Sequence, residues 1–311
     1  MNKPERVLVT GGAGFIGSHF VDKLITQGYN VRIIDDLSTG KKENIAGHLE
    51  NKEVDLIVGD IRDSNLVSKC LDGVSTVVHF AAQTSVTFSV EHPDLTFDIN
   101  ASGTKNLLSA CTKQAVGKFV FASTCAVYGD PACLPIDETC KTHPISPYAE
   151  SKLSAENICF EFDKQKLLQS VVLRFFNVYG LRQCLNDYSG VITRFIDLIK
   201  QKKALTIYGD GQQSRDFVDV QDIVGGVFAA MQSGDAPGQI FNIGSGKATT
   251  INELAKEISE LAGVKPEIKY EKERIGEIKH SYADISKAKK VLDYRPSISL
   301  HDGLKDLILA V

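Results

Sequence analysis

The chain lacks the features that mark several special classes of protein. No apolar stretch in it approaches the roughly 18 residues that a membrane-spanning helix needs. No run rich in lysine and arginine occurs and the net charge is −4, so nothing favours nucleic acid or an anionic membrane as a partner. Residues 1–4 lead directly into an expected strand and leave no room for a signal peptide. We therefore expect a cytoplasmic protein that binds neither nucleic acid nor membrane.

Cysteine is also too sparse to define the fold. Seven cysteines among 311 residues do not make the disulfide framework of a small secreted domain. Cys125, Cys133 and Cys140 cluster, but their spacing fits no zinc-binding pattern and no paired histidines accompany them. We expect reduced, mostly buried thiols and no metal site.

Apolar segments with strand and helix patterns alternate along the first 175 residues. This alternation predicts βαβ units and a parallel sheet covered on both faces, which is an α/β Rossmann fold with a doubly wound sheet. Hydrophobic residues make up 43% of the chain, enough to bury a large core. The expected strands are residues 5–10, 31–34, 54–58, 75–80, 117–123 and 170–175.

After about residue 176 the pattern loosens. We expect residues 1–175 to form the Rossmann domain, with a return of the chain near residues 216–242. Residues 176–311 should form a smaller C-terminal α/β lobe that binds the substrate. Expected helices in this part are residues 191–203, 221–232, 250–262 and 300–310, and expected short strands are residues 205–208, 239–242 and 267–270.

A glycine-rich turn at residues 11–17 joins the first expected strand to the first expected helix, which should stop at Gly28. Such a turn lets a pyrophosphate approach backbone N–H groups at a helix N-terminus. Asp35 closes the second strand, 18 residues beyond Gly17. A carboxylate there accepts hydrogen bonds from ribose hydroxyls and repels a 2′-phosphate, so we predict NAD rather than NADP. The competing interpretation is a structural turn with an incidental aspartate.

Tyr148 and Lys152 form the expected acid/base pair. Ser146 and Pro147 suit the N-cap and the first position of a helix, which puts Tyr148 in its first turn and Lys152 on the same face. A free tyrosine titrates near pH ~10, and a neighbouring ammonium group lowers that pKa. Alternatively, the two residues are a half-exposed aromatic and a solvated surface lysine.

These motifs resemble the extended short-chain dehydrogenase/reductase family, and within it the nucleotide-sugar epimerases and dehydratases, most of all the UDP-glucose/UDP-N-acetylglucosamine 4-epimerases. The resemblance runs nearly end to end. It rests on residues 9–18, 59–63, 79–83, 100, 127–131, 146–148 with 152, 174–180, 207–211, 215–217 and 241–244. It implies tightly held NAD and a UDP-, dTDP- or GDP-sugar substrate.

The segment before Val127 separates the reactions within this family. The dehydratases of this family carry Thr-Asp-Glu or Thr-Ser-Glu there, and the decarboxylases that act on UDP-glucuronate also carry a glutamate. This chain has Thr124, Cys125 and Ala126, none of which can act as a carboxylic acid at C5 of the sugar. The sequence therefore favours epimerisation at C4, through transient oxidation to a 4-keto sugar and return of hydride to either face. A 4,6-dehydratase or a C5-acting epimerase remains the alternative.

The resemblance also implies roles for individual residues. The catalytic residues are Thr124, Tyr148 and Lys152, with Thr124 bridging the sugar oxygen and Tyr148. The residues implied for the cofactor, besides Tyr148 and Lys152, are Gly11, Gly14, Phe15, Ile16, Gly17, Asp35, Asp36, Leu37, Ser38, Thr39, Gly40, Asp60, Ile61, Phe80, Ala81, Ala82, Asn100, Ser123 and Phe175. Those implied for the substrate, besides Thr124, are Ser85, Phe176, Asn177, Val191, Tyr208, Arg215, Arg274, Glu277 and Ser281.

Two of these substrate residues have competing interpretations. Ser85 fits a helix-capping loop nearly as well as a sugar pocket. Ser281 stands where epimerases restricted to glucose and galactose often have a bulky tyrosine, so its small side chain leaves room for an N-acetyl group, unless it is simply a surface serine.

At the level of the whole chain, the rival function is a non-catalytic, NAD-binding regulatory protein. The resemblance further implies a homodimer in which residues 93–112 and 148–166 pair as a four-helix bundle. An apolar stripe on these segments supports that pairing, although the same stripe would serve an intramolecular core. Its residues are Ile99, Leu107, Leu108, Leu153, Ile158 and Phe162.

Overall fold

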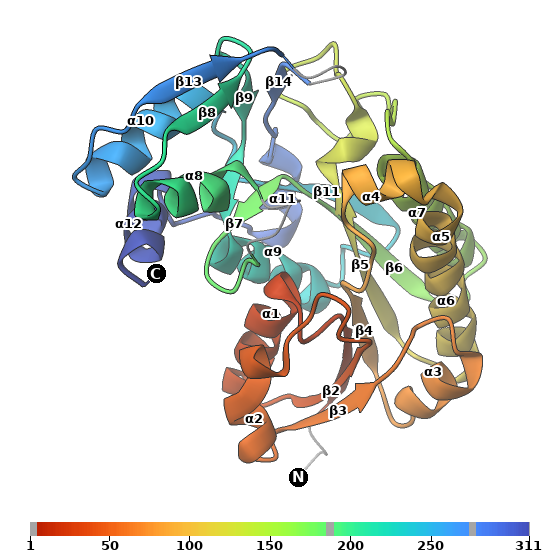
Figure 1. The fold of residues 1–311 in the computed structure, drawn as a ribbon. Helices are drawn as coiled ribbons and strands as arrows, with labels where there is room; N and C mark the ends of the chain where they lie inside the picture. Colours follow the sequence, from red (N-terminus) through yellow and green to blue (C-terminus); the bar gives the residue numbers. More distant parts are fainter. Residues whose placement is uncertain (1–4, 185–189, 274–277, 311) are drawn as a thin grey trace.

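A seven-stranded sheet forms the centre of the structure (Figure 1). The structure is a computed structural model that describes residues 5–184, 190–273 and 278–310. All neighbours in this sheet pair in parallel, in the order β11-β6-β5-β4-β1-β2-β3. The strands are β1 (Arg6–Thr10), β2 (Asn30–Asp35), β3 (Val54–Val58), β4 (Thr76–His79), β5 (Lys118–Thr124), β6 (Gln169–Phe175) and β11 (Gln239–Ile243).

The first six of these strands begin and end within one residue of the predicted positions. All four residues of β4 are buried, as expected for a strand covered on both faces. The strand order reverses between β1 and β4, and such a switch point is where open α/β sheets bind ligands. The predicted Rossmann fold is therefore confirmed.

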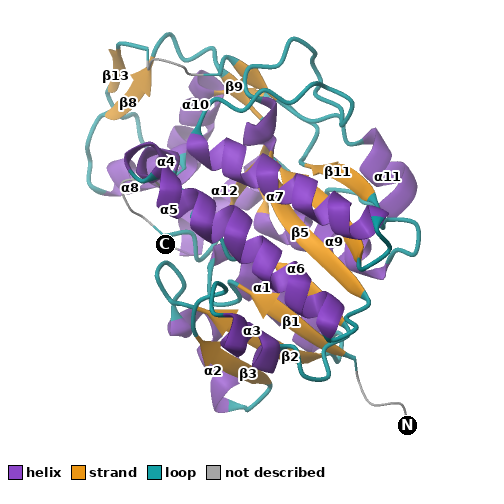
Figure 2. Ribbon diagram, turned by 90° about the vertical axis from the view of Figure 1, so that its right-hand side faces the viewer, coloured by secondary structure: helices purple, strands orange, loops and turns teal. Residues whose placement is uncertain are grey.

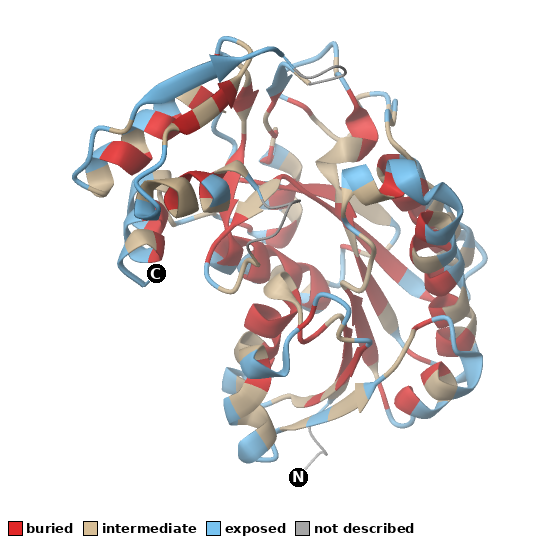
Figure 3. Cartoon of the chain, in the orientation of Figure 1, coloured by how far each residue is buried: buried red, intermediate tan, exposed pale blue. Residues whose placement is uncertain are grey.

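Helices cover both faces of the sheet (Figures 1 and 2). One face is covered by α1 (Phe15–Thr26), α9 (Val220–Gln232) and α11 (Ser286–Leu292), and the other by α3 (Ser64–Cys70), α6 (Gly103–Lys113) and α7 (Pro147–Lys164). Figure 3 shows the buried residues gathered on the strands and on the helix sides that face them. A fully buried Leu or Phe contributes about 1.5–3 kcal/mol, so these two layers supply much of the stability. As predicted, Gly28 follows the end of α1, with a left-handed φ of +79°.

Short helices fill the connections of this domain. They are η1 (Lys42–Ile45), α2 (Ala46–Glu50), α4 (Val86–Glu91), α5 (Pro93–Phe97), the π-helical η2 (Asp98–Ser102) and the 3₁₀-helical η3 (Cys125–Tyr128). Segments α5, η2 and α6 follow one another without a break. Among the described residues, no helix is both long enough and apolar enough to cross a membrane.

The C-terminal lobe has its own apolar core, built from α8, α10 and α12 around β8. Its helices are α8 (Val191–Lys200), α10 (Ile251–Leu261) and α12 (Leu300–Ala310), and its strands are β7 (Asn177–Tyr179), β8 (Leu205–Tyr208), β9 (Ser214–Arg215), β10 (Phe217–Asp219), β12 (Thr249–Thr250), β13 (Ile268–Glu271) and β14 (His280–Ser281). After β10 and α9 the chain returns to the large sheet as β11. The boundary at residue 175 stays a prediction.

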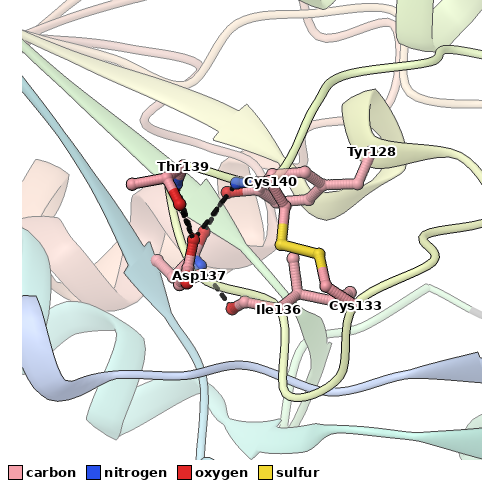
Figure 4. The surroundings of a disulfide bond; sticks show 7 residues. Tyr128, Cys133, Ile136, Asp137, Thr139 and Cys140 are labelled. Atoms are coloured by element: carbon pink, nitrogen blue, oxygen red, sulfur yellow. Dashed lines mark hydrogen bonds between the residues drawn. A yellow bond between two sulfur atoms is a disulfide. The ribbon is translucent and has the colours of Figure 1, made fainter.

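One prediction about cysteine is wrong. Cys133 and Cys140 form a disulfide bond rather than two reduced thiols (Figure 4). The carboxylate of Asp137 accepts hydrogen bonds from the N–H groups of Thr139 and Cys140, which folds this loop back and brings the two Cα atoms to 6.7 Å. A spacing of seven residues in a loop gives no sign of such a turn. Cys70, Cys111 and Cys159 are buried thiols, as expected.

Candidate active site

The glycine-rich turn lies at the carboxyl end of β1, beside the loop that follows β4. Gly11 has a left-handed φ of +67°, and a Cβ on it would lie 2.8 Å from the nitrogen of Ala81. A Cβ on Gly17 would overlap the carbonyl oxygen of Gly11. The two glycines therefore let the turn approach both α1 and the loop after β4 more closely than any other residue would.

The N-terminus of α1 carries no capping group of its own. Gly14 is the N-cap residue, so no side chain accepts a hydrogen bond there, and no acidic residue lies in the first turn. Exposed N–H groups and the positive end of the helix dipole favour an anion at this place. Phe15, Ile16 and Gly17 form that first turn. The turn and the helix end thus fit the pyrophosphate of a dinucleotide.

Asp35 ties the glycine turn to the loop at residues 36–40. Its carboxylate oxygens accept hydrogen bonds from the N–H of Ala13 and of Leu37, each at 2.9 Å. Burial raises the pKa of Asp35, while these two hydrogen bonds oppose the shift. Each oxygen keeps a further lone pair that a ribose hydroxyl can use. Gly40 packs directly on this carboxylate, and the exposed Asp36 accepts hydrogen bonds from Ser38.

Asp60 and Ile61 follow the end of β3. Arg62 pairs with the carboxylate of Asp60 at 2.6 Å and lowers its pKa. Ile61 is buried against Gly103. The N–H of Ala81 donates to the hydroxyl of Thr10 at 3.1 Å, which fixes the loop of Phe80, Ala81 and Ala82 beside the turn.

Tyr148 lies in the first turn of α7, where the structure confirms the predicted cap. The hydroxyl of Ser146 accepts a hydrogen bond from the N–H of Ala149 at 3.2 Å, and Pro147 is the first helical residue. Thr124 ends β5, and its side chain lies close enough to the hydroxyl of Tyr148 to lower the pKa of that phenol. The strand end and the helix start thereby bring the two predicted catalytic groups close together.

The pKa of Tyr148 departs from the sequence-based expectation. Burial raises it to about 12, and the side chain of Thr124 opposes that shift only in part. Lys152 is not among the groups that shift it, so the prediction that Lys152 lowers this pKa is not met by the protein's own side chains. The phenol is therefore the stable form.

Lys152 is buried rather than a solvated surface lysine, with only 3% of its surface exposed. Its ammonium nitrogen lies 4.2 Å from the centre of the Phe121 ring. Burial lowers the pKa of Lys152 to about 8, and nearby Cys159 and Glu156 oppose the shift. The charge that this residue carries near neutral pH is consequently sensitive to small changes around it.

Neither Glu156 nor Arg174 was predicted from the sequence to support this site. Glu156 is buried one turn beyond Lys152, accepts a hydrogen bond from the hydroxyl of Ser123, and pairs with Arg174 at 2.6 Å. The ion pair anchors α7 to β5 and β6 directly beneath Thr124. A signal for Glu156 was available, because the spacing of four residues from Tyr148 to Lys152 continues to it.

Asn100 in η2 and Ser85 in the loop after β4 support the site. The side chain of Asn100 hydrogen-bonds to the N–H and the carbonyl of Gln83 and to the hydroxyl of Ser151. The hydroxyl of Ser85 accepts a hydrogen bond from the N–H of Phe88 at 3.0 Å and caps α4. The capping interpretation of Ser85 is thus shown, and a role in binding sugar stays a prediction.

Four of the predicted substrate residues lie in or next to β7, β9 and β14: Phe176, Asn177, Arg215 and Ser281. Asn177 donates its backbone N–H to the carbonyl of Asp216 at 2.9 Å, and its side-chain Oδ1 is buried without a hydrogen-bond partner among the described residues. A buried acceptor of this kind is expected to meet a ligand or a water. Phe176 is buried beside it.

Arg215 and Ser281 lie opposite each other in the pair β9–β14. The carboxylate of Asp216 fixes this pair by accepting hydrogen bonds from three backbone N–H groups of residues 245, 246 and 283. Burial raises the pKa of the Cys125 thiol to about 11, and the side chain of the buried Ser281 lies close enough to that thiol to lower its pKa slightly. Because Cys125 follows Thr124, Ser281 lies beside the catalytic strand end and is no surface serine.

The remaining substrate predictions are less informed by the structure. Val191 begins α8 and packs on the core of the C-terminal lobe, and Tyr208 ends β8. Arg274 and Glu277 lie outside the described residues. Within the described part of the chain, no group of three or more His, Cys, Asp or Glu residues is placed to hold a metal ion.

Comparisons with known proteins bear on this arrangement. The profile described as "NAD dependent epimerase/dehydratase family" matches residues 7–244. A "Putative UDP-glucose 4-epimerase" of Methanocaldococcus jannaschii is 42% identical over 304 residues, 97% of either chain. "UDP-glucuronic acid decarboxylase 1" of Arabidopsis thaliana is 36% identical over 98% of this chain and 69% of that protein.

A solved structure extends the similarity to the arrangement in space. It is the UDP-N-acetylglucosamine 4-epimerase from Methanobrevibacter ruminantium M1 in complex with UDP-N-acetylmuramic acid. Its TM-score is 0.94 at 37% identity, over 99% of this chain and 98% of that one.

Proposed function

Because this chain belongs to the NAD-dependent epimerase/dehydratase family, we propose that it is a nucleotide-sugar C4 epimerase that interconverts UDP-glucose and UDP-galactose. One observation supports this proposal above all. The side chain of Thr124 lies near the hydroxyl of Tyr148 at the carboxyl end of β5, and residues 123–129 supply no carboxylic acid beside them. The site has an acid/base for a sugar hydroxyl and lacks one in this segment for C5.

The buried carboxylates of Glu156 and Asp216 interact with residues 123–129, but both already bind other groups. Glu156 is bound by Ser123 and the guanidinium of Arg174. Asp216 is held by Ser245 and by backbone N–H groups. Neither is disposed to take a proton from C5, which weighs against the dehydratase and decarboxylase reactions that relatives perform.

Bound NAD would supply the positively charged acceptor that takes and returns hydride at C4 of the sugar. The chain's own residues handle the proton. Tyr148 removes it from the 4-hydroxyl, and Thr124 holds that oxygen and the phenol together. A cation brought beside the ring lowers the pKa of Tyr148 from about 12 toward the working range, and Lys152 stands one helical turn away.

Binding of the diphosphate is proposed for Arg215, with Arg274 as a second guanidinium. A guanidinium pairs with phosphate oxygens in a bidentate manner. The buried Oδ1 of Asn177 would accept a hydrogen bond from the nucleotide sugar, and Glu277 would meet the ribose. Firm contacts at the diphosphate and few at the hexose allow the keto sugar to present either face.

We further propose that UDP-N-acetylhexosamines are substrates. Ser281 is small, and its side chain lies near Cys125, the residue that follows Thr124. Room for an N-acetyl group at C2 follows from that small side chain. The structural relative that is named a UDP-N-acetylglucosamine 4-epimerase agrees with this choice.

The test is to incubate the purified protein with a panel of UDP-sugars, with no NAD added, and to follow products by NMR. Interconversion of C4 epimers without solvent deuterium at C5 is expected. Deuterium at C5 would instead support a dehydratase or C5-acting epimerase. Release of NAD on denaturation without turnover of any sugar in the panel would favour the non-catalytic alternative.

A further inference from the structure

His79 is buried at the end of β4, with 1% of its surface exposed, and no step of the proposed chemistry uses it. We propose that His79 is a positioning residue: a neutral imidazole with its proton on Nε2 that sets the place of Tyr148 and Lys152 relative to the strand ends. The inference about catalysis rests on the proposed function. The assignment of the proton does not.

The hydrogen bonds around the ring fix where its proton is. The hydroxyl of Thr10 accepts the N–H of Ala81 at 3.1 Å and lies 2.6 Å from Nδ1 of His79, to which it donates its own hydrogen when that nitrogen carries no proton. The hydroxyl of Thr104 donates to the carbonyl of Asn100 at 2.6 Å, so it can only accept from Nε2 of His79 at 2.9 Å. Each threonine hydroxyl has one hydrogen, so in a neutral ring the proton lies on Nε2.

A second proton on the ring is disfavoured by its surroundings. A proton on Nδ1 would displace the hydrogen that Thr10 donates there. Rings of Phe119 and Phe121 lie 5.7 and 5.6 Å from the imidazole, and burial together with the charge of Lys152 holds the pKa of His79 well below its usual range. The surroundings therefore favour a neutral imidazole that accepts a hydrogen bond at Nδ1 and donates one at Nε2.

One connection runs through hydrogen bonds to the catalytic helix. Thr104 links His79 to Asn100, which lies in the π-helical segment η2. The side chain of Asn100 binds Ser151, and the hydroxyl of Ser151 donates to the carbonyl of Tyr148 at 2.8 Å. The first turn of α7 is thus coupled to the end of β4, and π-helical turns of this kind occur often at functional sites.

A second connection runs through aromatic contacts. The imidazole packs against the ring of Phe121, and the ammonium nitrogen of Lys152 lies 4.2 Å from the centre of that same ring. A neutral imidazole tolerates this ammonium group, whereas an imidazolium would repel it. The ring thus helps to hold Lys152 where it can act on Tyr148.

Simple core packing is the competing explanation, and two substitutions separate the explanations. His79→Phe keeps a ring of similar size but removes both hydrogen bonds. His79→Gln removes the ring but keeps one acceptor and one donor. If His79 only packs the core, kcat of His79→Phe should be higher than that of His79→Gln. If His79 positions the catalytic groups through hydrogen bonds, kcat of His79→Gln should be the higher of the two.

The experiment measures kcat, KM and the pH profile of both variants on the UDP-sugar that the wild type turns over best. We expect kcat of His79→Phe to fall about 10- to 100-fold with KM changed less than about threefold, since small misplacements of reacting groups have effects of this size. The acid limb of its kcat profile should move to higher pH, because Tyr148 loses support from Lys152. His79→Gln should recover part of kcat.

Phe119→Leu is the control variant, because Phe119 contacts the imidazole ring but takes no part in the hydrogen bonds of this network. This substitution should lower thermal stability and leave kcat within about twofold of wild type.

Two further measurements test the proposal and do not depend on catalytic activity. Imidazole ¹⁵N spectra of the wild type should show His79 protonated only at Nε2 down to the lowest pH at which the protein stays folded. Hydrogen exchange should show the amides of residues 149–152 less protected in the Phe variant than in the Gln variant. A proton on Nδ1, or a fully active Phe variant beside a weaker Gln variant, overturns the inference. Absence of turnover by the wild type would refute the proposed function and leave these two measurements decisive.

Discussion

At the scale of single residues, the proposed chemistry depends on a phenol that the protein alone keeps protonated. Burial raises the pKa of Tyr148 to about 12, and its one helpful partner is the hydroxyl of Thr124. The reaction needs the phenolate, so the rate should rise with pH through the pKa that Tyr148 has in the working complex. General acid–base catalysis by one side chain contributes on the order of 10²- to 10⁴-fold.

Replacing Tyr148 by Phe should therefore lower kcat by at least about 10²-fold. Thr124→Val should lower kcat less, and Thr124→Ser should retain most of it, because the serine keeps the bridging hydroxyl. Steady-state rates over a range of pH check this, with circular dichroism as the control for folding. Full activity of the Phe variant would remove Tyr148 from the mechanism.

Ser281 carries the prediction for substrate range. Ser281→Tyr should abolish turnover of UDP-N-acetylglucosamine, because the ring fills the space next to Cys125, while turnover of UDP-galactose persists. Ser281→Ala, which removes the hydroxyl and adds no bulk, is the matched control and should keep both activities. Equal loss of both substrates in the tyrosine variant would show that the pocket for the C2 substituent lies elsewhere.

At the scale of elements, the glycine turn and α1 form the unit on which cofactor binding depends. A methyl group on Gly17 would overlap the carbonyl oxygen of Gly11, whereas a methyl group on Gly47 in α2 would meet no atom within 4 Å. Gly17→Ala should destabilise the protein by about 1–3 kcal/mol and reduce the NAD that copurifies with it. Gly47→Ala should be neutral or slightly stabilising. Thermal unfolding and the NAD content of denatured samples measure both effects, and equal behaviour of the two variants would contradict the argument.

The sequence predicted the elements well where the pattern was local. The apolar run of β4 and the helix cap at Ser146 are each determined by residues adjacent in sequence. Their predicted positions therefore agree with the structure to within one residue. The π-helical turn around Asn100 was missed, because an i+5 turn has no sequence signature separate from a helix. The burial of Lys152 was also beyond local pattern, since it arises from α7 packing on β5 and β6.

The same limit applies to the site. Thr124, Tyr148 and the glycine turn follow from motifs, but His79, Glu156 and Arg174 act through contacts between elements distant in sequence. With the protein's own groups alone, burial of the ring raises the pKa of Tyr148, and the expectation that a neighbouring ammonium group and an oxidised nicotinamide lower it stays a prediction. A sequence motif identifies the side chains of the site, and their packing in the fold determines which protonation state is stable.

At the scale of the whole molecule, the disulfide of Cys133 and Cys140 is the feature least expected from composition. Trypsin releases residues 119–141 as one peptide that also contains Cys125. In denatured protein without reductant, iodoacetamide should modify Cys125 and spare the other two cysteines. After reduction all three should be modified, as peptide mass spectrometry would show. Modification of all three without reductant would mean that the bond is absent in the purified protein.

The predicted homodimer concerns residues 93–112 and 148–166, which form α5, η2, most of α6 and α7. Leu107 and Leu108 of the predicted stripe are fully buried within the chain, so they serve the core rather than a partner. Val90 and Leu95 remain 64% and 40% exposed on the adjoining helices. We expect a particle of twice the chain mass by light scattering, and Leu95→Arg should shift it toward the monomer, with Leu309→Arg on the exposed side of α12 as the control. A monomeric wild type would refute the pairing.

The place of β11 has a consequence for how this protein can be divided. This edge strand and the helix α9 that leads to it are made from chain that has already passed through the C-terminal lobe. A gene fragment that stops at residue 175 would leave the border of β6 unpaired and would remove α9 and α11 from the α1 side of the sheet. The two lobes are therefore not interchangeable modules: grafting a new specificity onto this scaffold means replacing loops in place, not exchanging one half for another.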